Sequence, residues 1–391
     1  MLKDHLNGDI TNENPTLDLD EVQRLASNHQ LSGFLYFQCH NWLKKEQYKK
    51  IYSRLQQYYS AQLVLHASRQ RCFDKLKQQM IQQKIPFAPF KGGEIAQYYP
   101  FPNLRSASDI DVLVHTQDRE KVQALLEAEG FKTTTSENGE WWFEKGKIVF
   151  EVHNRLLFDV FTNTQEGIAF CDRCWEFASA DEGSSQFTLD PGFHLIYMLL
   201  HIRKHIMYHG IGLRQFLDLA VILRRIPDAF NWKWISENLD SLNLLRFAQT
   251  CFALCENWFD VRNPLGNYTL ADDFYKTVTD TIFANGVFGN SNAENEVAGL
   301  THTVAESKLP YLLEIIKITM GNLFPSYNEL CAVPYYSFLK HRPWLLPFTW
   351  IYRLIIVIKH KFGYGKEVLI QPIGKRDAVE ARTQMLNDWG L

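Results

Sequence analysis

The sequence predicts an α+β fold in which a small mixed β-sheet is flanked by an N-terminal helical region and a C-terminal all-α domain. Three observations support this prediction. From Asp20 to Lys84 the chain has one isolated glycine and no proline, and apolar residues recur near helical spacing. Residues 86–153 contain several strand-like runs separated by turn residues. From Pro191 the pattern is helical again, so helices are expected both before and after the sheet in the sequence.

Four divisions of the chain follow from this pattern. Residues 1–16 are polar and are expected to form a flexible arm. Residues 17–85 are expected to form an N-terminal helical region of three or four helices, residues 86–190 the sheet core, and residues 191–391 a C-terminal helical domain. A length of 391 residues is sufficient for two or three domains.

The core elements are expected in the order strand, helix, strand, helix, hairpin and strand. They are a strand at Pro86–Phe90, a short helix at Glu94–Tyr99, a strand at Ser108–Val114, a helix at Asp118–Glu129 ended by Gly130, strands at Phe131–Ser136 and Trp141–Glu144 around an Asn138-Gly139 turn, and a strand at Lys147–His153. Residues 156–190 look irregular and are expected to lead into the next domain.

Composition narrows the class of protein. The net charge of −3 gives no general basic surface, so there is no strong nucleic-acid signal and template-directed polymerisation is disfavoured. The N-terminus has no apolar signal region, which predicts a cytoplasmic protein. Seven cysteines fit reduced thiols better than a disulfide framework. Cys171 and Cys174 have the spacing of a metal or redox pair, but no second pair with zinc spacing follows.

Two aspartates interrupt an otherwise apolar strand. Asp109 and Asp111 are two residues apart, so on a strand their side chains would project from one face at ~7 Å separation. Like charges held that close raise each other's pKa unless a cation neutralises them. Carboxylate oxygens are ligands that Mg²⁺ and Mn²⁺ favour. The pair therefore predicts a divalent metal site.

A third acid lies on the last strand of the core. Glu151 shares a strand face with His153, and a neighbouring strand could bring it beside the two aspartates. Three carboxylates around one or two divalent ions can clamp a triphosphate and lower the pKa of an attacking hydroxyl. The set predicts phosphoryl or nucleotidyl transfer.

A glycine pair precedes the short helix of the core. Gly92 and Gly93 would let backbone N–H groups approach phosphate oxygens at the start of that helix. Lys91 and Arg105 could add full positive charges. These four residues are the candidate nucleotide-binding residues.

The order Lys-Gly-Gly, helix, Arg, Asp-Ile-Asp, helix, Gly-Phe, strand, Glu-Val-His resembles the uncharacterised nucleotidyltransferase family of bacterial proteins, within the DNA polymerase β-like nucleotidyltransferase superfamily. The likeness covers roughly residues 20–290. It implies a nucleotidyltransferase core at residues 86–190, phosphate contacts from Gly92 and Gly93, and metal ligation by Asp109, Asp111 and Glu151. Gly93 stands where the superfamily often has serine.

The resulting hypothesis is a metal-dependent enzyme that moves a nucleoside monophosphate (NMP) from a nucleoside triphosphate (NTP) to an unidentified acceptor and releases pyrophosphate. Mg²⁺ or Mn²⁺ and an NTP are the expected cofactor and substrate, and the helical domain at 191–391 would select the acceptor. Two alternatives stay open. One is an inactive nucleotide-binding or scaffold protein, which the missing serine at Gly93 motivates. The other is an enzyme that adenylylates a protein or RNA.

A row of histidines lies on the first predicted helix of the C-terminal domain. His194, His201, His205 and His209 fall on one face at ~100° per residue. The face could contact the nucleotide or acceptor, His201 and His205 could bind a transition metal, or the face could be an ordinary polar one.

Further along, Arg214 and Asp218 are four residues apart and can pair on one helix face, and a structural ion pair and a substrate contact are equally compatible with the spacing. His153, His201, His205 and Arg214 are the candidate substrate-facing residues.

Two later segments have open roles. Residues 284–304 are rich in Gly, Asn and Ala and could form a lid or a linker. The run 344–358 is the most apolar in the chain but is shorter than the ~20 residues that span a bilayer. With its basic flank at 359–361, the segment 344–361 could be a buried or partner-binding helix or a peripheral membrane contact.

Overall fold

The computed structural model describes residues 18–135, 141–157, 164–180, 182–208, 210–225, 230–286, 342–351 and 376–391, together with residues 324, 326–327, 330 and 338–339. The chain forms two compact units, Met1–Asn290 with Trp389–Leu391, and Ser291–Asp388. The first unit contains the sheet and every candidate site residue. The arm at 1–16, the Asn138-Gly139 turn, His209 and the 284–304 loop from residue 287 lie outside the described residues.

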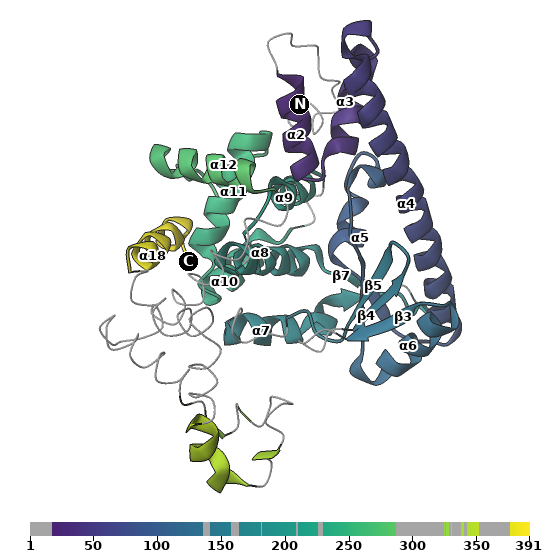
Figure 1. Ribbon diagram of the computed structural model, residues 1–391, viewed down its shortest axis with the longest axis vertical. Helices are drawn as coiled ribbons and strands as arrows, with labels where there is room; N and C mark the ends of the chain where they lie inside the picture. Colours follow the sequence, from purple (N-terminus) through teal and green to yellow (C-terminus); the bar gives the residue numbers. More distant parts are fainter. Residues whose placement is uncertain are drawn as a thin grey trace. The chain divides into compact units, whose positions relative to one another are not determined.

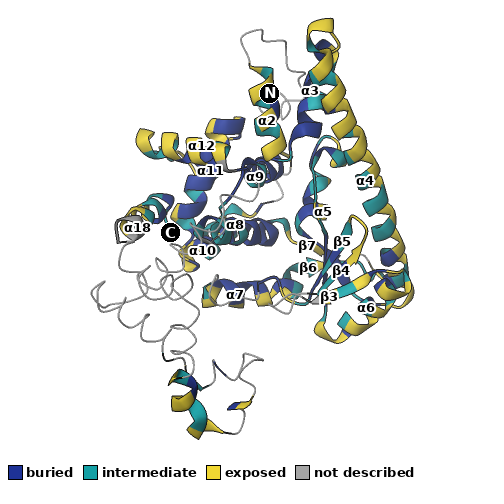
Figure 2. Ribbon diagram, in the orientation of Figure 1, coloured by how far each residue is buried: buried dark blue, intermediate teal, exposed yellow. Residues whose placement is uncertain are grey.

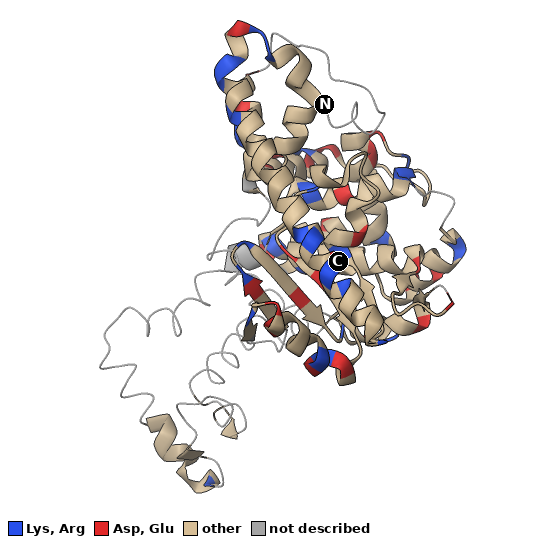
Figure 3. Cartoon of the chain, turned by 90° about the vertical axis from the view of Figure 1, so that its right-hand side faces the viewer, with Lys and Arg blue, Asp and Glu red and all other residues tan. Residues whose placement is uncertain are grey.

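In the described residues three α-helices precede the sheet, and they confirm the predicted N-terminal helical region (Figure 1). They are α2 (Leu19–Asn28), α3 (Ser32–Leu43) and α4 (Lys49–Gln82), with a 3₁₀ helix η1 (Glu46–Tyr48) before α4. Asp18 caps α2 because its carboxylate accepts from the backbone N–H groups of Asp20 and Glu21, each at 3.1 Å. The long helix α4 carries most of its Lys and Arg residues on an exposed surface (Figure 3). Its second half buries Leu76 and Met80 against the sheet.

The sheet is mixed, as predicted, and has five strands. They are β1 (Phe87–Pro89), β2 (Ile110–Val114), β3 (Lys132–Thr135), β4 (Trp141–Lys145) and β5 (Ile148–His153), in the spatial order β1-β2-β5-β4-β3. β2 and β5 are parallel, and the other neighbouring pairs are antiparallel. The β2–β5 register places Asp111 opposite Glu151.

The two faces of β2 and β5 have different chemistry because successive side chains of a strand point to opposite sides. One face carries the apolar side chains Ile110, Val112, Val114, Phe150 and Val152. These pack with α4 and with Val122 and Leu126 of α6 (Arg119–Ala128) in the main core. Figure 2 shows dark blue, buried stretches in the sheet beside teal and yellow ones, and β2 is buried at all of its positions. The opposite face carries the acids, so the packed face fixes which way the acids point.

The glycine pair lies inside a helix and not in front of it. α5 spans Lys91–Ala96, three residues earlier than the predicted Glu94–Tyr99 helix. Lys91 has a φ of 48°, so the left-handed backbone turn occurs at this lysine. Because Lys91 makes the turn, Gly92 and Gly93 fall in the first turn of α5.

The segment after β5 is not irregular, which corrects the sequence interpretation. It contains α7 (Gln165–Asp172), η4 (Cys174–Phe177), β6 (Ala178–Ser179) and β7 (Thr188–Leu189). The Thr164 hydroxyl accepts from the Gly167 N–H at 3.1 Å and caps α7. Phe87 of β1 donates its N–H to Ser185 O and accepts from Phe187 N–H. These bonds cover the open edge of the sheet, so long-range pairing and not local pattern orders the segment.

Helices follow, as predicted. They are α8 (Pro191–Tyr208), α9 (Leu213–Arg225), α10 (Trp232–Ser241), α11 (Leu245–Phe259), α12 (Asp272–Asn285) and, near the C-terminus, α18 (Arg376–Trp389); short 3₁₀ helices are η2 (Pro102–Leu104), η3 (Thr116–Asp118) and η7 (Pro343–Leu345). Gly210 has a φ of 75°, consistent with the expected break after α8. α8 to α12 lie within Met1–Asn290, so they belong to the same compact unit as the sheet.

Within the described residues, no helix has both the length and the apolar character needed to cross a bilayer. The segment 344–361 is described only as far as Ile351. In the described portion Trp344, Phe348 and Ile351 are exposed. Its role as a partner or membrane contact stays a prediction.

The packed face of the sheet yields a stability prediction. Phe150 is fully buried between the sheet and its covering helices, so Phe150→Ala should lower the free energy of unfolding by about 3–5 kcal/mol through lost contacts and a cavity. Phe101 is 48% exposed, and Phe101→Ala should cost about 1 kcal/mol or less. Chemical denaturation of both variants measures the difference, and equal losses would contradict this placement of the core.

Candidate active site

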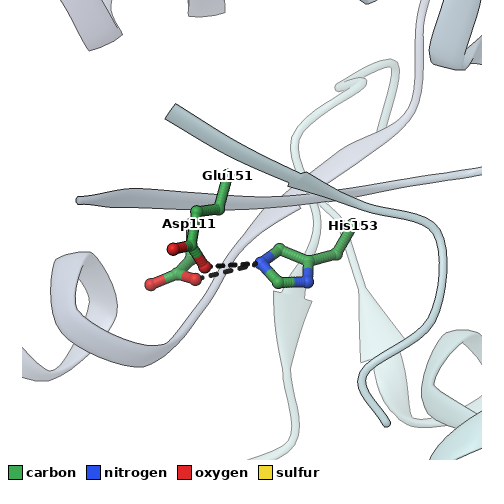
Figure 4. A group of neighbouring side chains, drawn as sticks. All are labelled: Asp111, Glu151 and His153. Carbon is green, nitrogen blue, oxygen red and sulfur yellow. Dashed lines mark hydrogen bonds and ion pairs between the residues drawn. The ribbon is translucent and has the colours of Figure 1, made fainter. Parts of the chain in front are cut away.

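Two carboxylates and a histidine meet on the polar face of the sheet. Asp111 and Glu151 are directly opposite on parallel strands, and His153 follows Glu151 by two residues on the same face. His153 Nε2 lies 3.1 Å from Asp111 Oδ1 and 3.4 Å from Glu151 Oε2 (Figure 4). Asp111 and His153 are buried, and the ligand atoms of all three side chains lie within 4.8 Å of one another. The predicted meeting of the β2 and β5 acids therefore occurs for Asp111 and Glu151.

A lysine neutralises part of this acidic cluster. Lys91 Nζ lies 2.8 Å from Asp111 Oδ1 and 3.7 Å from Glu151 Oε2. Burial would raise the pKa of Asp111, but Lys91 and the hydrogen bond from His153 outweigh it and hold that pKa below its usual range. Burial likewise opposes the charge of Lys91, yet Asp111, Tyr197 and Glu151 raise the pKa of its ammonium well above normal. The lysine is thus charged and bound to the acids.

Asp109 lies one residue before β2 and outside the three-residue cluster. It accepts a hydrogen bond from the Ser108 hydroxyl at 2.9 Å. Burial, and then the charges of Asp111 and Glu151, raise the pKa of Asp109 to about 6. Asp109 therefore feels the like-charge repulsion expected from an Asp-x-Asp pair, although only Asp111 belongs to the strand.

The donor set fits a divalent cation. Carboxylate oxygens from Asp111 and Glu151 suit Mg²⁺ and Mn²⁺, and an imidazole nitrogen from His153 suits Mn²⁺ better than Mg²⁺. The three carboxylates Asp109, Asp111 and Glu151 carry more negative charge than one ammonium and one imidazole, those of Lys91 and His153, can neutralise. Among the described residues, this is the one group of three or more acidic, His or Cys side chains that could hold a metal ion.

The two glycines have different surroundings. A Cβ on Gly92 would lie 2.5 Å from Arg105 Nη1, whereas a Cβ on Gly93 would meet no heavy atom within 4 Å. Gly92 is buried and Gly93 is exposed. Gly92 is therefore required for the close approach of a guanidinium, and position 93 has room for a larger side chain.

Arg105 is held by an aspartate that lies 113 residues further along the chain. Its Nε and Nη2 donate to Asp218 Oδ1 and Oδ2, each at 2.8 Å, and the Tyr99 hydroxyl donates to Asp218 Oδ1 at 2.7 Å. The Arg214–Asp218 ion pair that the spacing allows is therefore not formed, because Asp218 points to Arg105. Of the Arg105 nitrogens, Nη1, which faces Gly92, is the one not bonded to Asp218.

Arg214 binds neutral oxygens. Its Nη1 donates to the Gln30 side-chain oxygen at 2.6 Å and to the Ser106 carbonyl at 3.2 Å. Gln30 lies between α2 and α3, 184 residues away in the chain, and no local sequence signal identifies it. Sequence analysis missed Gln30 and Tyr99 for the same reason.

A cavity of about 250 Å³ joins most of these groups. Its lining includes Lys91, Gly92, Arg105, Asp109, Asp111, Glu151, His201, His205 and Arg214. A second cavity, of about 270 Å³, shares Gly92, Arg105, Asp109 and Asp111 and adds Gly93 and Arg69. Of the candidate site residues, His153 lines neither cavity and is buried beside the carboxylates. Arg69, which sequence analysis also missed, is one of several basic residues on α4.

Two of the predicted histidines line the first cavity. The Nε2 atoms of His201 and His205 are 3.0 Å apart, so one of them must donate a hydrogen to the other. Burial, and then the neighbouring His205 and Lys91, hold the pKa of His201 well below its usual value. His194 is buried away from both cavities, and burial lowers its pKa to about 4. The described residues place no third metal-binding side chain with the His201–His205 pair, so a transition-metal site there lacks support.

Cys171 and Cys174 are buried free thiols. Burial raises the pKa of both, that of Cys174 to about 11, which disfavours the thiolate needed for metal binding or redox chemistry. These cysteines therefore serve as small buried side chains.

Comparison with known proteins finds a matching family. A family model described as uncharacterised nucleotidyltransferase matches residues 15–260, which is more than half of the chain and includes every candidate site residue. No curated protein and no solved structure matches the chain.

The glycine pair supplies a matched test. Gly92→Ala should displace Arg105 from Asp218 and cost about 1–3 kcal/mol of unfolding free energy, because it disturbs a buried charged hydrogen bond. Gly93→Ala should be neutral or stabilising by up to about 1 kcal/mol, because alanine is the better helix former. Thermal and chemical unfolding measure both. Tolerance of Gly92→Ala with loss at Gly93→Ala would contradict the described packing.

Asp109 supplies a pH test in a metal-free buffer. Its pKa of about 6 in the folded chain exceeds the unfolded value of about 3.9, so the folded state binds the proton more tightly and loses stability as pH rises from about 4 to 6. Asp109→Asn removes this loss and should be more stable than the parent at pH 8 by on the order of 2 kcal/mol, with no advantage at pH 4. Denaturation at both pH values measures it.

Asp172→Asn is the control, because Asp172 is exposed and pairs with Arg155. It should show no gain at pH 8. If Asp109→Asn were the less stable protein at pH 8, the assigned repulsion would be wrong.

Proposed function

The chain belongs to the uncharacterised nucleotidyltransferase family, and from that premise we propose that it is a metal-dependent enzyme that moves an NMP from an NTP to an acceptor and releases pyrophosphate. One observation carries the proposal. Asp111 and Glu151 lie opposite each other on parallel strands at the wall of a cavity, and Asp109 lines the same cavity with a raised pKa. Buried acids that lack sufficient positive charge are the expected surroundings of a divalent ion.

Asp109, Asp111 and Glu151 would hold Mg²⁺ or Mn²⁺. When bound, such an ion offsets charge on phosphate oxygens and lowers the pKa of an attacking hydroxyl. His153 would orient the Asp111 carboxylate, as a hydrogen-bond donor behind a metal ligand commonly does. The carboxylate oxygens of the three acids suit both Mg²⁺ and Mn²⁺.

The residues around Gly92 would hold the phosphates. Lys91 neutralises Asp111 in the described structure, and its flexible stem lets the ammonium turn to a phosphate oxygen when another cation is present. Arg105 is fixed by Asp218 with Nη1 directed toward Gly92. Gly93 is exposed and has no side chain, so a phosphate could approach its backbone N–H.

In the proposed transfer, the acceptor hydroxyl oxygen forms a bond to the α-phosphorus. The bond from that phosphorus to the oxygen bridging the β-phosphate breaks. Pyrophosphate leaves with the bonding electron pair. The hydroxyl proton passes to the Glu151 carboxylate.

The helices that follow the sheet would select the acceptor. α8 brings His201 and His205 to the cavity that Asp111 and Glu151 line. Side chains from residues 191–391 are thus in position to contact a substrate, which supports the proposed role of the C-terminal helical region. The segment 344–361 remains a candidate contact for a membrane or a protein partner.

A nucleotide-binding protein without turnover is the second candidate. Gly93 lacks the hydroxyl that the superfamily often has, and the Lys91 ammonium lies on Asp111. Titration with Mg²⁺ or Mn²⁺ and each NTP, followed by a pyrophosphate-release assay, separates the two: binding with no release by any NTP favours this candidate.

Replacing the acids tests the enzyme proposal. Asp111→Asn should reduce metal-dependent pyrophosphate release by at least about 100-fold, because it removes a ligand charge at the reacting phosphate. Asp172→Asn, at an exposed ion pair outside both cavities, should leave the rate unchanged. Steady-state assays with Mg²⁺ and Mn²⁺ measure both, and undiminished release by Asp111→Asn defeats the assignment.

A further inference from the structure

Arg214 is a partly buried cation without an anionic partner. Its hydrogen bonds go to the neutral oxygens of Gln30 and Ser106, and its Nε is buried with no hydrogen-bond partner. Among the described residues, no carboxylate lies within ion-pair distance of its guanidinium. Burial, and then the nearby Arg105, lower the pKa of Arg214, so its surroundings disfavour the charge that it carries.

The nearest acid in the sequence does not supply the missing charge. Asp218 is one helical turn from Arg214 on α9, but both of its oxygens are bonded to Arg105, and one also accepts from Tyr99. Desolvating a guanidinium is costly unless an anion compensates it. Since the described part of the chain supplies none, a ligand anion is the expected partner.

The cavity that Arg214 lines is polarised in charge. At one end three carboxylates, Asp109, Asp111 and Glu151, lie beside the single ammonium of Lys91. Elsewhere on the same cavity wall lies the guanidinium of Arg214, which forms no ion pair with a described carboxylate. A cation-bound polyphosphate neutralises both, because its metal ion meets the acids and its terminal phosphates carry the remaining negative charge.

We propose that Arg214 forms a binding subsite for the terminal phosphates of the NTP, the part released as pyrophosphate. This inference rests on the proposed function and adds an orientation to it: the reacting phosphate faces the acids, and the leaving group extends toward α9. Gln30 and Ser106 act as positioning residues, because they fix the guanidinium through hydrogen bonds from outside α9. A planar guanidinium suits this task, since it can give two parallel hydrogen bonds to a phosphate.

Calorimetric titration of the full chain tests the subsite. The ligands are pyrophosphate with Mn²⁺, a nonhydrolysable NTP with Mn²⁺, and the matching NMP. Arg214→Gln should weaken pyrophosphate and NTP binding by about 10- to 100-fold, because a charged hydrogen bond is lost, and should leave NMP binding unchanged. Arg214→Lys should fall between Arg214→Gln and the parent, because it keeps the charge and loses the paired donors.

The matched control is Arg54→Gln. Arg54 also donates to a glutamine oxygen, that of Gln23 at 2.9 Å, but lines neither cavity. Its affinities should equal those of the parent. If Arg214→Gln fails to fold, Gln30→Ala replaces it; this variant keeps the guanidinium but frees it to move, and should weaken pyrophosphate binding about 3- to 10-fold.

Several outcomes overturn the subsite. Equal pyrophosphate affinity in Arg214→Gln and the parent does so, and so does an equal loss of NMP and pyrophosphate binding. A third is a dependence on Arg214 for binding of malonate but not of pyrophosphate, which would assign the anion to a carboxylate of the acceptor. The proposed function fails separately: pyrophosphate binding that requires Arg214, without pyrophosphate release from any NTP, supports the subsite and removes the transfer.

Discussion

The convergence of buried negative charge on the polar face of the sheet is the constraint on which the site depends. The parallel register of β2 and β5 brings Asp111 against Glu151, and Asp109 adds a third carboxylate at the strand entrance. Like charges in a partly buried place are unfavourable without cations. The chain supplies Lys91 and His153, and one ammonium and one imidazole carry less positive charge than three ionised carboxylates carry negative charge. The site therefore lacks positive charge, which a divalent ion can supply.

Hydrogen bonds of two arginines join the sheet region to α9 and to the N-terminal helices. Asp218 of α9 fixes Arg105, which precedes β2, in a two-bond pair, and Gln30 of the N-terminal region fixes Arg214. These contacts hold together three separate stretches of chain around the cavity. They also leave Arg105 Nη1 and Arg214 as positive groups near an acidic centre. Acids that attract a metal and arginines that attract phosphate are complementary requirements of one substrate, a metal-bound NTP.

Prediction from sequence succeeded where local pattern controls structure. Alternation in β2 and β5 separates Val112 and Phe150 from Asp111 and Glu151, and the packed face then sets the direction of the acids. It failed where a local rule met a distant competitor. The i, i+4 rule pairs Arg214 with Asp218, but Arg105, 113 residues from Asp218, offers two parallel bonds and takes the carboxylate. Residues 156–190 form ordered elements because they cover the edge at Phe87.

Periodicity and short motifs are local properties of the chain, and they were enough to predict the mixed sheet between helices, the order of glycines and acids, and the family. The folded structure adds that Lys91 lies on Asp111, that Gly92 makes room for Arg105, and that Arg214 forms no ion pair with a described carboxylate. Those facts depend on side chains up to 184 residues apart, whose pairing is set by competition among all nearby donors and acceptors once the core has packed.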